Sequence, residues 1–404
     1  MDEPKKQTQN DLLLDASADE GPQNNEATKP SSDVPPKPAA VAPTGSKRKH
    51  HPLQWIKTHK KKSAIIAVLL VLFLGGGSVL AYTQLRKDPP PTPAPAPVVE
   101  EKPVEPPAPT TKASPLTGVQ VSPELADRPV TGMIVENSPE ARPQSGLSEA
   151  GVVFEATAEG GITRFIAFWQ EAQPKNIGPV RSLRPYFIDW ALPFQASVGH
   201  VGGSPQALSE VGPTGLRDID QGGNGKYFRR TTDRYAPHNV YTTSGEQDSA
   251  QRDKGFTKSE FTPWPRKADE PMATPTKNNI TFDISSALFR VNYTYDKASN
   301  TYPRKVAGEP HINREDKKQI APKVVIVLKM AHRLVDAQHY GITTTGSGTA
   351  YVFQDGGVTE GTWSKADRKS MFEFKDTAGA PIKLNAGQAW ISILPADRGV
   401  TSTQ

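Results

Sequence analysis

The feature that most restricts the architecture of this chain is an uncharged apolar stretch from Ala64 to Tyr82. As a helix, its 19 residues would span about 28 Å, which is close to the thickness of the hydrocarbon core of a bilayer. A lysine-rich cluster at residues 57–62 comes directly before it, and fewer basic residues follow it. Because basic residues favour the cytoplasmic side, the sequence predicts a transmembrane helix over residues 63–83. The N-terminus is then cytoplasmic, and everything after Tyr82 is extracytoplasmic.

A cleaved signal peptide is the competing interpretation of this stretch, because Val79-Leu-Ala81 has the small-residue character of a cleavage site. Two observations favour a retained anchor. The polar region before the apolar run is more than 60 residues long. The run itself also exceeds the roughly 7–15 apolar residues of a signal peptide.

Two segments of biased composition flank the apolar stretch. Residues 1–62 are polar, rich in Pro, Asn, Asp and Ser, and end in the basic cluster, so we expect a disordered cytoplasmic tail. Residues 84–112 are rich in proline, most densely between Pro89 and Pro97. Such a composition favours extended polyproline II structure, so we expect a semi-rigid stalk.

Composition excludes several classes of function. The chain of 404 residues contains no cysteine, which excludes disulfides, a thiol nucleophile, a thiolate metal site and a lipid-modified cysteine. The net charge is only +5, and much of it lies beside the apolar stretch, where anionic lipid is the expected partner. Nucleic-acid binding is the less favoured explanation of that cluster. We therefore expect no nucleic-acid partner and no cofactor.

The remaining sequence is globular in composition and predicts an α+β fold in two parts. Residues 113–265 mix short strands with helical segments, and Ser204-Pro205 has the pattern of a helix N-cap followed by proline at the first helical position. Residues 278–398 predict mainly antiparallel strands, with a hairpin turn at Asp355-Gly-Gly357. The predicted strands are residues 131–136, 151–156, 162–169, 196–200, 279–284, 289–295, 301–304, 324–328, 351–353, 358–363, 372–374, 381–384 and 389–394.

Several motifs resemble the YerB-like family of bacterial cell-envelope proteins, whose main domain carries a label of unknown function. The motifs lie at residues 142–150, 159–165, 178–184, 200–204, 302–304 with His311, 361–363 and 387–390. The resemblance covers residues 114–396 and implies a two-part extracytoplasmic domain, without an established reaction. Many relatives resemble lipoproteins, whereas this chain lacks the lipid-modified cysteine and has the apolar stretch instead.

Arginines alternate with acidic residues across the N-terminal half, and two glycine pairs lie among them. Guanidinium groups bind carboxylate or phosphate through a planar fork, and glycine-rich turns expose backbone N–H groups to anions. One interpretation is a pocket for an anionic envelope ligand; the other is that the arginines pair with the neighbouring acids and stabilise the fold. The candidate binding residues are Arg142, Glu159, Arg164, Arg181, Arg184, His200 and Ser204.

Catalytic signatures are incomplete. Glu155 and Glu159 could form an acid–base pair, but on a regular strand they would share a face with Cα atoms about 13 Å apart, too far for a glycosidase pair. His200 precedes Ser204, but the sequence around Ser204 is not a nucleophile elbow. The histidines after Tyr82 lack metal-ligand spacing, so we expect no metal site.

The sequence therefore favours a membrane-tethered envelope protein that binds an anionic cell-wall polymer or an envelope partner protein without catalysis. The alternative hypothesis is a wall-active hydrolase or transferase that uses Glu155, Glu159 or His200.

Overall fold

The computed structural model describes residues 110–404. The predicted tail, transmembrane helix and all but the last residues of the stalk lie outside the described residues. Within residues 110–404, no helix is long and apolar enough to cross a membrane.

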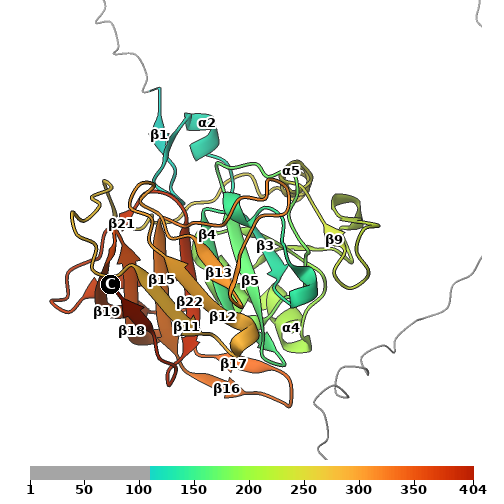
Figure 1. Ribbon diagram of the computed structural model, residues 1–404. Helices are drawn as coiled ribbons and strands as arrows, with labels where there is room; N and C mark the ends of the chain where they lie inside the picture. Colours follow the sequence, from blue (N-terminus) through green and yellow to red (C-terminus); the bar gives the residue numbers. More distant parts are fainter. Residues whose placement is uncertain (1–109) are drawn as a thin grey trace, which may run out of the picture. The chain divides into compact units, whose positions relative to one another are not determined.

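A ten-stranded mixed sheet forms the centre of the fold (Figure 1). Five strands come from each half of the sequence. In spatial order they are β20 (Glu373–Asp376), β19 (Gly357–Lys365), β18 (Gly346–Gln354), β15 (Val324–Met330), β22 (Ala389–Pro395), β4 (Val152–Glu159), β5 (Ile162–Trp169), β3 (Thr131–Glu136), β6 (Ser197–His200) and β7 (Arg217–Asp220).

The two halves of the sequence meet inside this sheet. Strand β22 pairs in parallel with both β15 and β4, so that Ile391 lies between Ile326 and Phe154. Strands β3, β6 and β7 are also parallel to one another, and β5 is antiparallel to both β3 and β4. The carboxyl ends of β3, β4, β6, β7, β15 and β22 therefore lie at one edge of the sheet, which we call the carboxyl edge.

Helices cover one face of the sheet, which we call the helical face. Helix α3 (Pro185–Ala191) buries Phe187 and Trp190 against Phe154 of β4. Helix α4 (Pro205–Thr214) begins as the sequence predicts, because the Ser204 hydroxyl accepts a hydrogen bond from the N–H of Ala207 at 3.2 Å. The short helix η4 (Leu192–Phe194) continues α3.

A second sheet packs against the opposite face. Its five strands run in the order β14 (Glu309–Pro310), β13 (Arg304–Val306), β12 (Arg290–Thr294), β11 (Asn279–Asp283) and β23 (Thr401–Thr403), all antiparallel. Its apolar side chains share one buried cluster with Phe165 and Trp390 of the large sheet. Helix α5 (Ser244–Asp253) also buries Ala250 in that cluster.

Short elements complete the described chain. The two-residue and three-residue strand pairs are β1 (Lys112–Ala113) with β2 (Gln120–Val121), β8 (Arg229–Arg230) with β9 (Val240–Tyr241), β10 (Arg266–Lys267) with β21 (Leu384–Asn385), and β16 (His332–Leu334) with β17 (Tyr340–Ile342). The short helices are α2 (Pro123–Ala126), η2 (Pro139–Ala141), η3 (Leu147–Glu149), η5 (Gly225–Tyr227) and η6 (Ala287–Phe289).

The predicted mixture of helix and strand is confirmed, as is the mainly antiparallel character of the C-terminal half. The hairpin at Asp355-Gly356 joins β18 to β19, and Asp355 adopts the positive φ that this turn requires. The strand expected at residues 381–384 is replaced by an isolated bridge between Pro381 and Lys375 and by the two-residue strand β21, which begins at Leu384. Strand β7, helix α5 and the β16–β17 hairpin were not predicted.

Candidate functional site

Glu159, Arg164 and Arg184 converge at the carboxyl edge, on the helical face. Arg164 donates to both oxygens of the Glu159 carboxylate, through Nη2 to Oε1 and through Nη1 to Oε2 at 3.3 Å, and Arg184 donates to Oε2. The backbone carbonyls of Ser182 and Leu183 accept further hydrogen bonds from Arg164 at 3.1 Å and from Arg184 at 2.8 Å. Burial opposes ionisation of Glu159, but the two adjacent guanidinium groups outweigh it and hold the pKa of that carboxyl below its ordinary value.

A β-bulge puts Glu159 into this cluster. The register between β4 and β5 shifts between Thr157 and Glu159, and the extra residue exchanges the faces to which the following side chains point. Glu155 lies on the opposite face, against the second sheet, where it pairs with Arg304. The expectation that Glu155 and Glu159 share a face is therefore wrong.

Arg181 forms a second ion pair beside the first. Its Nε lies 3.2 Å from Glu136 Oε2, and Nδ1 of His238 lies 2.8 Å from the same oxygen. Burial lowers the pKa of Arg181 and Arg164 lowers it further, whereas Glu136 opposes both effects. Glu136 and Arg164 are register partners on β3 and β5, so the two ion pairs form one network.

This network contains more positive than negative charge. Three guanidinium groups face two carboxylates, and the Nε atoms of Arg164 and Arg184 are buried without a hydrogen-bond partner. The Arg181 side chain is 23% exposed, and its terminal nitrogens donate no hydrogen bond to other residues in the range 110–404. The arrangement leaves one accessible cation that is only partly neutralised. We call these five residues (Glu136, Glu159, Arg164, Arg181 and Arg184) the arginine cluster.

The other sequence-predicted site residues lie outside the arginine cluster. Both ring nitrogens of His200 face oxygen acceptors, Nε2 at 2.6 Å from Asp218 and Nδ1 at 2.8 Å from the carbonyl of Gly202. The Ser204 hydroxyl is engaged as the N-cap of α4. Neither side chain therefore has the free geometry of a base or a nucleophile in this conformation.

Arg142 lies near the face that packs against the second sheet. Its Nε donates to Asn137 Oδ1 at 3.1 Å, and its guanidinium lies 5.1 Å from the ring centroid of Phe289. Burial, with a smaller contribution from Arg304, lowers the pKa of Arg142 to about 10. Arg142 therefore connects the two sheets rather than joining the arginine cluster.

Two protein-family domains match the described region. Residues 116–257 match the N-terminal domain of a family described as "Protein of unknown function (DUF3048)", and residues 280–391 match its C-terminal domain. The chain belongs to this family. Together the two matches cover more than half of the chain, and they fall in the two regions that meet in the ten-stranded sheet.

A similar protein and a solved structure agree with this assignment. The protein named "Putative lipoprotein YerB" from Bacillus subtilis (strain 168) is 32% identical over 288 residues, which are 70% of this chain and 86% of that protein. The crystal structure of YerB from Bacillus subtilis matches with a TM-score of 0.65 and 30% identity, over 72% of this chain and 99% of that chain. The YerB-like resemblance is thereby confirmed.

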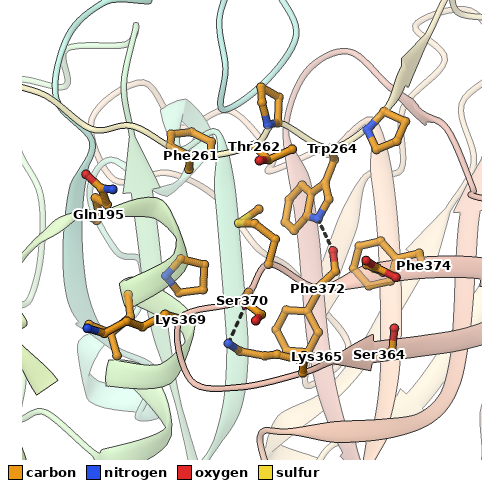
Figure 2. A pocket seen from close by; sticks show the side chains of 18 of the residues that line it. Gln195, Phe261, Thr262, Trp264, Ser364, Lys365, Lys369, Ser370, Phe372 and Phe374 are labelled. Atoms are coloured by element: carbon orange, nitrogen blue, oxygen red, sulfur yellow. Dashed lines mark hydrogen bonds between the residues drawn. The ribbon is translucent and has the colours of Figure 1, made fainter.

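The helical face also carries an open groove that sequence reasoning missed (Figure 2). Its volume is about 1170 Å³. One wall is the segment that carries Phe261 and Trp264, and the other includes the end of β19 and the start of β20 with Phe372 and Phe374. Six separate parts of the sequence line the groove, so no local sequence motif indicates it.

The walls of this groove are fixed by hydrogen bonds. The buried Lys365 ammonium donates to three backbone carbonyls of the following loop, those of Asp367, Arg368 and Ser370, at 2.8, 2.9 and 2.7 Å. Burial lowers the pKa of Lys365 to about 8. On the facing wall, the Trp264 indole N–H donates to the carbonyl of Phe372 at 2.8 Å. Hydrogen bonds within the chain therefore hold both walls of the groove in place.

Proposed function

We propose that this protein is an envelope-associated binding protein that is tethered to the membrane through residues 64–82. The basic cluster before this stretch favours a cytoplasmic N-terminus and extracytoplasmic domains. The name of its relative, a lipoprotein, supports a membrane-associated location on the same side by a different anchor.

Protease protection tests this topology. Protease added to intact, wall-stripped cells should digest residues after Tyr82 and leave residues 1–62 protected. Loss of the N-terminal tail with protection of the C-terminal half would reverse the proposed orientation. A soluble fragment that starts near residue 82 would indicate signal-peptide cleavage instead.

We propose that the arginine cluster binds a phosphate or carboxylate group of an envelope ligand. The observation that carries this proposal is the incompletely neutralised Arg181, which is accessible beside the buried Arg164 and Arg184. The location also supports it, because ligands of open sheets that contain parallel strands bind outside the carboxyl ends of those strands. The alternative role of the cluster is structural, with each arginine held by its acidic neighbour.

A wall-active hydrolase or transferase has less support. A pair of carboxylates that acts on one glycosidic bond must face the same substrate, whereas Glu155 and Glu159 point to opposite faces of β4. In addition, Asp218 and the carbonyl of Gly202 engage both ring nitrogens of His200. We therefore propose binding rather than catalysis.

The test is retention of the full chain on cell walls purified from Bacillus subtilis, with and without removal of their phosphate-linked polymers. We expect Arg181→Gln to weaken retention about tenfold to more than a hundredfold, because a charge-assisted hydrogen bond contributes about 1.5–3 kcal/mol. If phosphate is the ligand group, stripped walls should lose the binding; if it is a wall carboxylate, they should keep it.

Two further variants separate binding from folding. Arg252→Gln is the matched control, because Arg252 is an exposed arginine on α5 whose side chain hydrogen-bonds, within residues 110–404, to the nearby Ser249 alone. Arg184→Lys keeps the charge but cannot reproduce a two-nitrogen contact. Unchanged wall retention of both cluster variants, together with a clearly lower melting temperature, would refute the anion site and assign the cluster to stability.

A further inference from the structure

We propose that the groove on the helical face is a second binding site, and that its ligand is an oligosaccharide chain bearing acidic groups. This site is separate from the arginine cluster, and the proposal does not depend on the anion site. None of the residues that line the groove belongs to the cluster.

The size of the groove indicates an oligomeric ligand. Sites for single small molecules usually enclose about 300–1,000 Å³, and this groove reaches about 1170 Å³ while remaining open to solvent. An open site of this size suits several linked units of a chain better than one enclosed metabolite.

The groove combines the surface types that a sugar chain requires. The partly exposed Phe261 and Met371 and the exposed Pro263 and Pro265 supply apolar surface for the C–H faces of sugar rings. Polar side chains lie among them, including the exposed Gln195 and Thr262, and offer hydrogen bonds to hydroxyl and acetamido groups.

The charge of the groove selects acidic chains over neutral ones. Four basic side chains and two acidic side chains line it. One of the acids, Glu373, already pairs with Lys375 at 2.9 Å. The exposed Lys369 has no acidic partner within the described residues 110–404, so its ammonium is available to a carboxylate of the ligand.

The rigidity of the groove favours binding without large rearrangement. Arg368 joins the loop after Lys365 to helices α3 and α4, through Asp189 and Glu210. On the other side, Arg217 donates to the carbonyl of Gln195 at 2.7 Å. Because the chain's own side chains make these contacts, little ordering cost remains for binding.

The first experiment blocks the groove. We propose calorimetric titration of the full chain with a soluble hexasaccharide of alternating N-acetylglucosamine and N-acetylmuramic acid, which carries three carboxylates per molecule. Thr262→Trp introduces a large ring at an exposed groove position and should weaken binding at least on the order of tenfold. The matched control is Thr377→Trp, at an exposed position outside the groove, and it should bind as the unaltered chain does.

The second experiment tests the charge. Lys369→Gln should weaken binding of the acidic hexasaccharide about three- to fivefold, as expected for one exposed ion pair. It should leave the weaker binding of neutral N-acetylglucosamine hexamer unchanged. Lys383→Gln, an exposed lysine outside the groove, is the control.

Three outcomes would overturn the proposal. The first is no detectable binding of the acidic hexasaccharide at millimolar concentration. The second is binding that Thr262→Trp leaves intact, because the ligand then lies elsewhere. The third is equal affinity for the neutral and acidic hexamers, which removes the role of the lysine. Since none of these variants alters the arginine cluster, wall retention through that cluster is tested separately.

Discussion

Replacing Arg304 by methionine should destabilise the fold strongly, because it removes the counterion of a buried carboxylate. Arg304 and Glu155 are both 0% exposed, and Arg304 Nη2 lies 2.7 Å from Glu155 Oε2. They join the second sheet to the ten-stranded sheet. The Arg304 guanidinium also lies 4.7 Å from the ring centroid of Trp390.

The expected loss can be judged from the contacts that remain. Glu155 would keep three neutral donors: Asn137 at 3.1 Å, Thr163 at 3.0 Å and Trp390 at 3.2 Å. These donors solvate the carboxylate in part, and Arg142 acts on it electrostatically, but no cation remains in an ion pair with it within residues 110–404. Breaking a buried pair by removing one partner costs about 3–5 kcal/mol. We expect Arg304→Met to lower the free energy of unfolding by an amount within this range.

Urea unfolding of the full chain measures the effect. The double variant Glu155→Gln/Arg304→Met should lose at least about 2 kcal/mol less than the sum of the single variants, because it leaves no buried charge unpaired. Arg290→Met is the control, since the Arg290–Asp283 pair is exposed and should contribute no more than about 1 kcal/mol. Equal losses for Arg304→Met and Arg290→Met would refute the reasoning.

Two further predictions concern His311 and Gly361, which belong to the motifs shared with the YerB-like family. Burial, followed by Arg304 and Arg142, lowers the pKa of His311 well below its ordinary value. Below about pH 6.5 the unfolded chain therefore binds a proton at His311 that the folded chain does not. The free energy of unfolding should decrease there by up to about 1.4 kcal/mol per pH unit. Urea unfolding at pH 7.5 and 5.5 should show a smaller decrease for His311→Gln than for the unaltered chain. A Cβ at Gly361 would lie 1.9 Å from the Lys375 carbonyl oxygen, so thermal unfolding should show Gly361→Ala much less stable than Gly223→Ala, where nothing lies within 4 Å.

Local structure was predictable where a few neighbouring residues determine it. The Ser204-Pro205 pair predicted the start of α4, because a hydroxyl cap and a proline act within one helical turn. The turn at Asp355-Gly356 likewise predicted a hairpin, because the two residues tolerate the backbone conformation that the turn requires.

The arrangement of the sheet was not predictable in the same way. The pairing of β22 with β4 joins residues more than 230 positions apart, such as Ile391 and Phe154. The alternation of apolar and polar residues within a strand does not indicate which other strand pairs with it. The bulge before Glu159 was also invisible, because its residues are compatible with a regular strand. That single irregularity decides which face Glu159 occupies and therefore which arginines it meets.

Only some of the candidate binding residues could be predicted, because residues far apart in the sequence meet in the folded chain. The density of arginines and acids indicated charge pairing, and the structure brings Glu159, Arg164 and Arg184 together. It also shows that Glu155 pairs with Arg304, which was not among the candidate residues. The groove was missed entirely, because its aromatic side chains come from segments that meet only in the folded chain.

The position of the arginine cluster has a consequence for a tethered protein. The described chain enters at the edge opposite to the cluster, where the carbonyl of Thr117 accepts a hydrogen bond from the N–H of Gly387 at 2.9 Å, just before β22. Strand β4, of 8 residues, runs from this edge to the cluster at Glu159, a distance of about 26 Å at about 3.3 Å per residue. In the proposed topology the anchor precedes residue 110, so that the chain arrives at the edge of the sheet away from the cluster. In this arrangement the proposed anion site is separated from the point of attachment by the full height of the sheet, which leaves it accessible to a ligand in the wall.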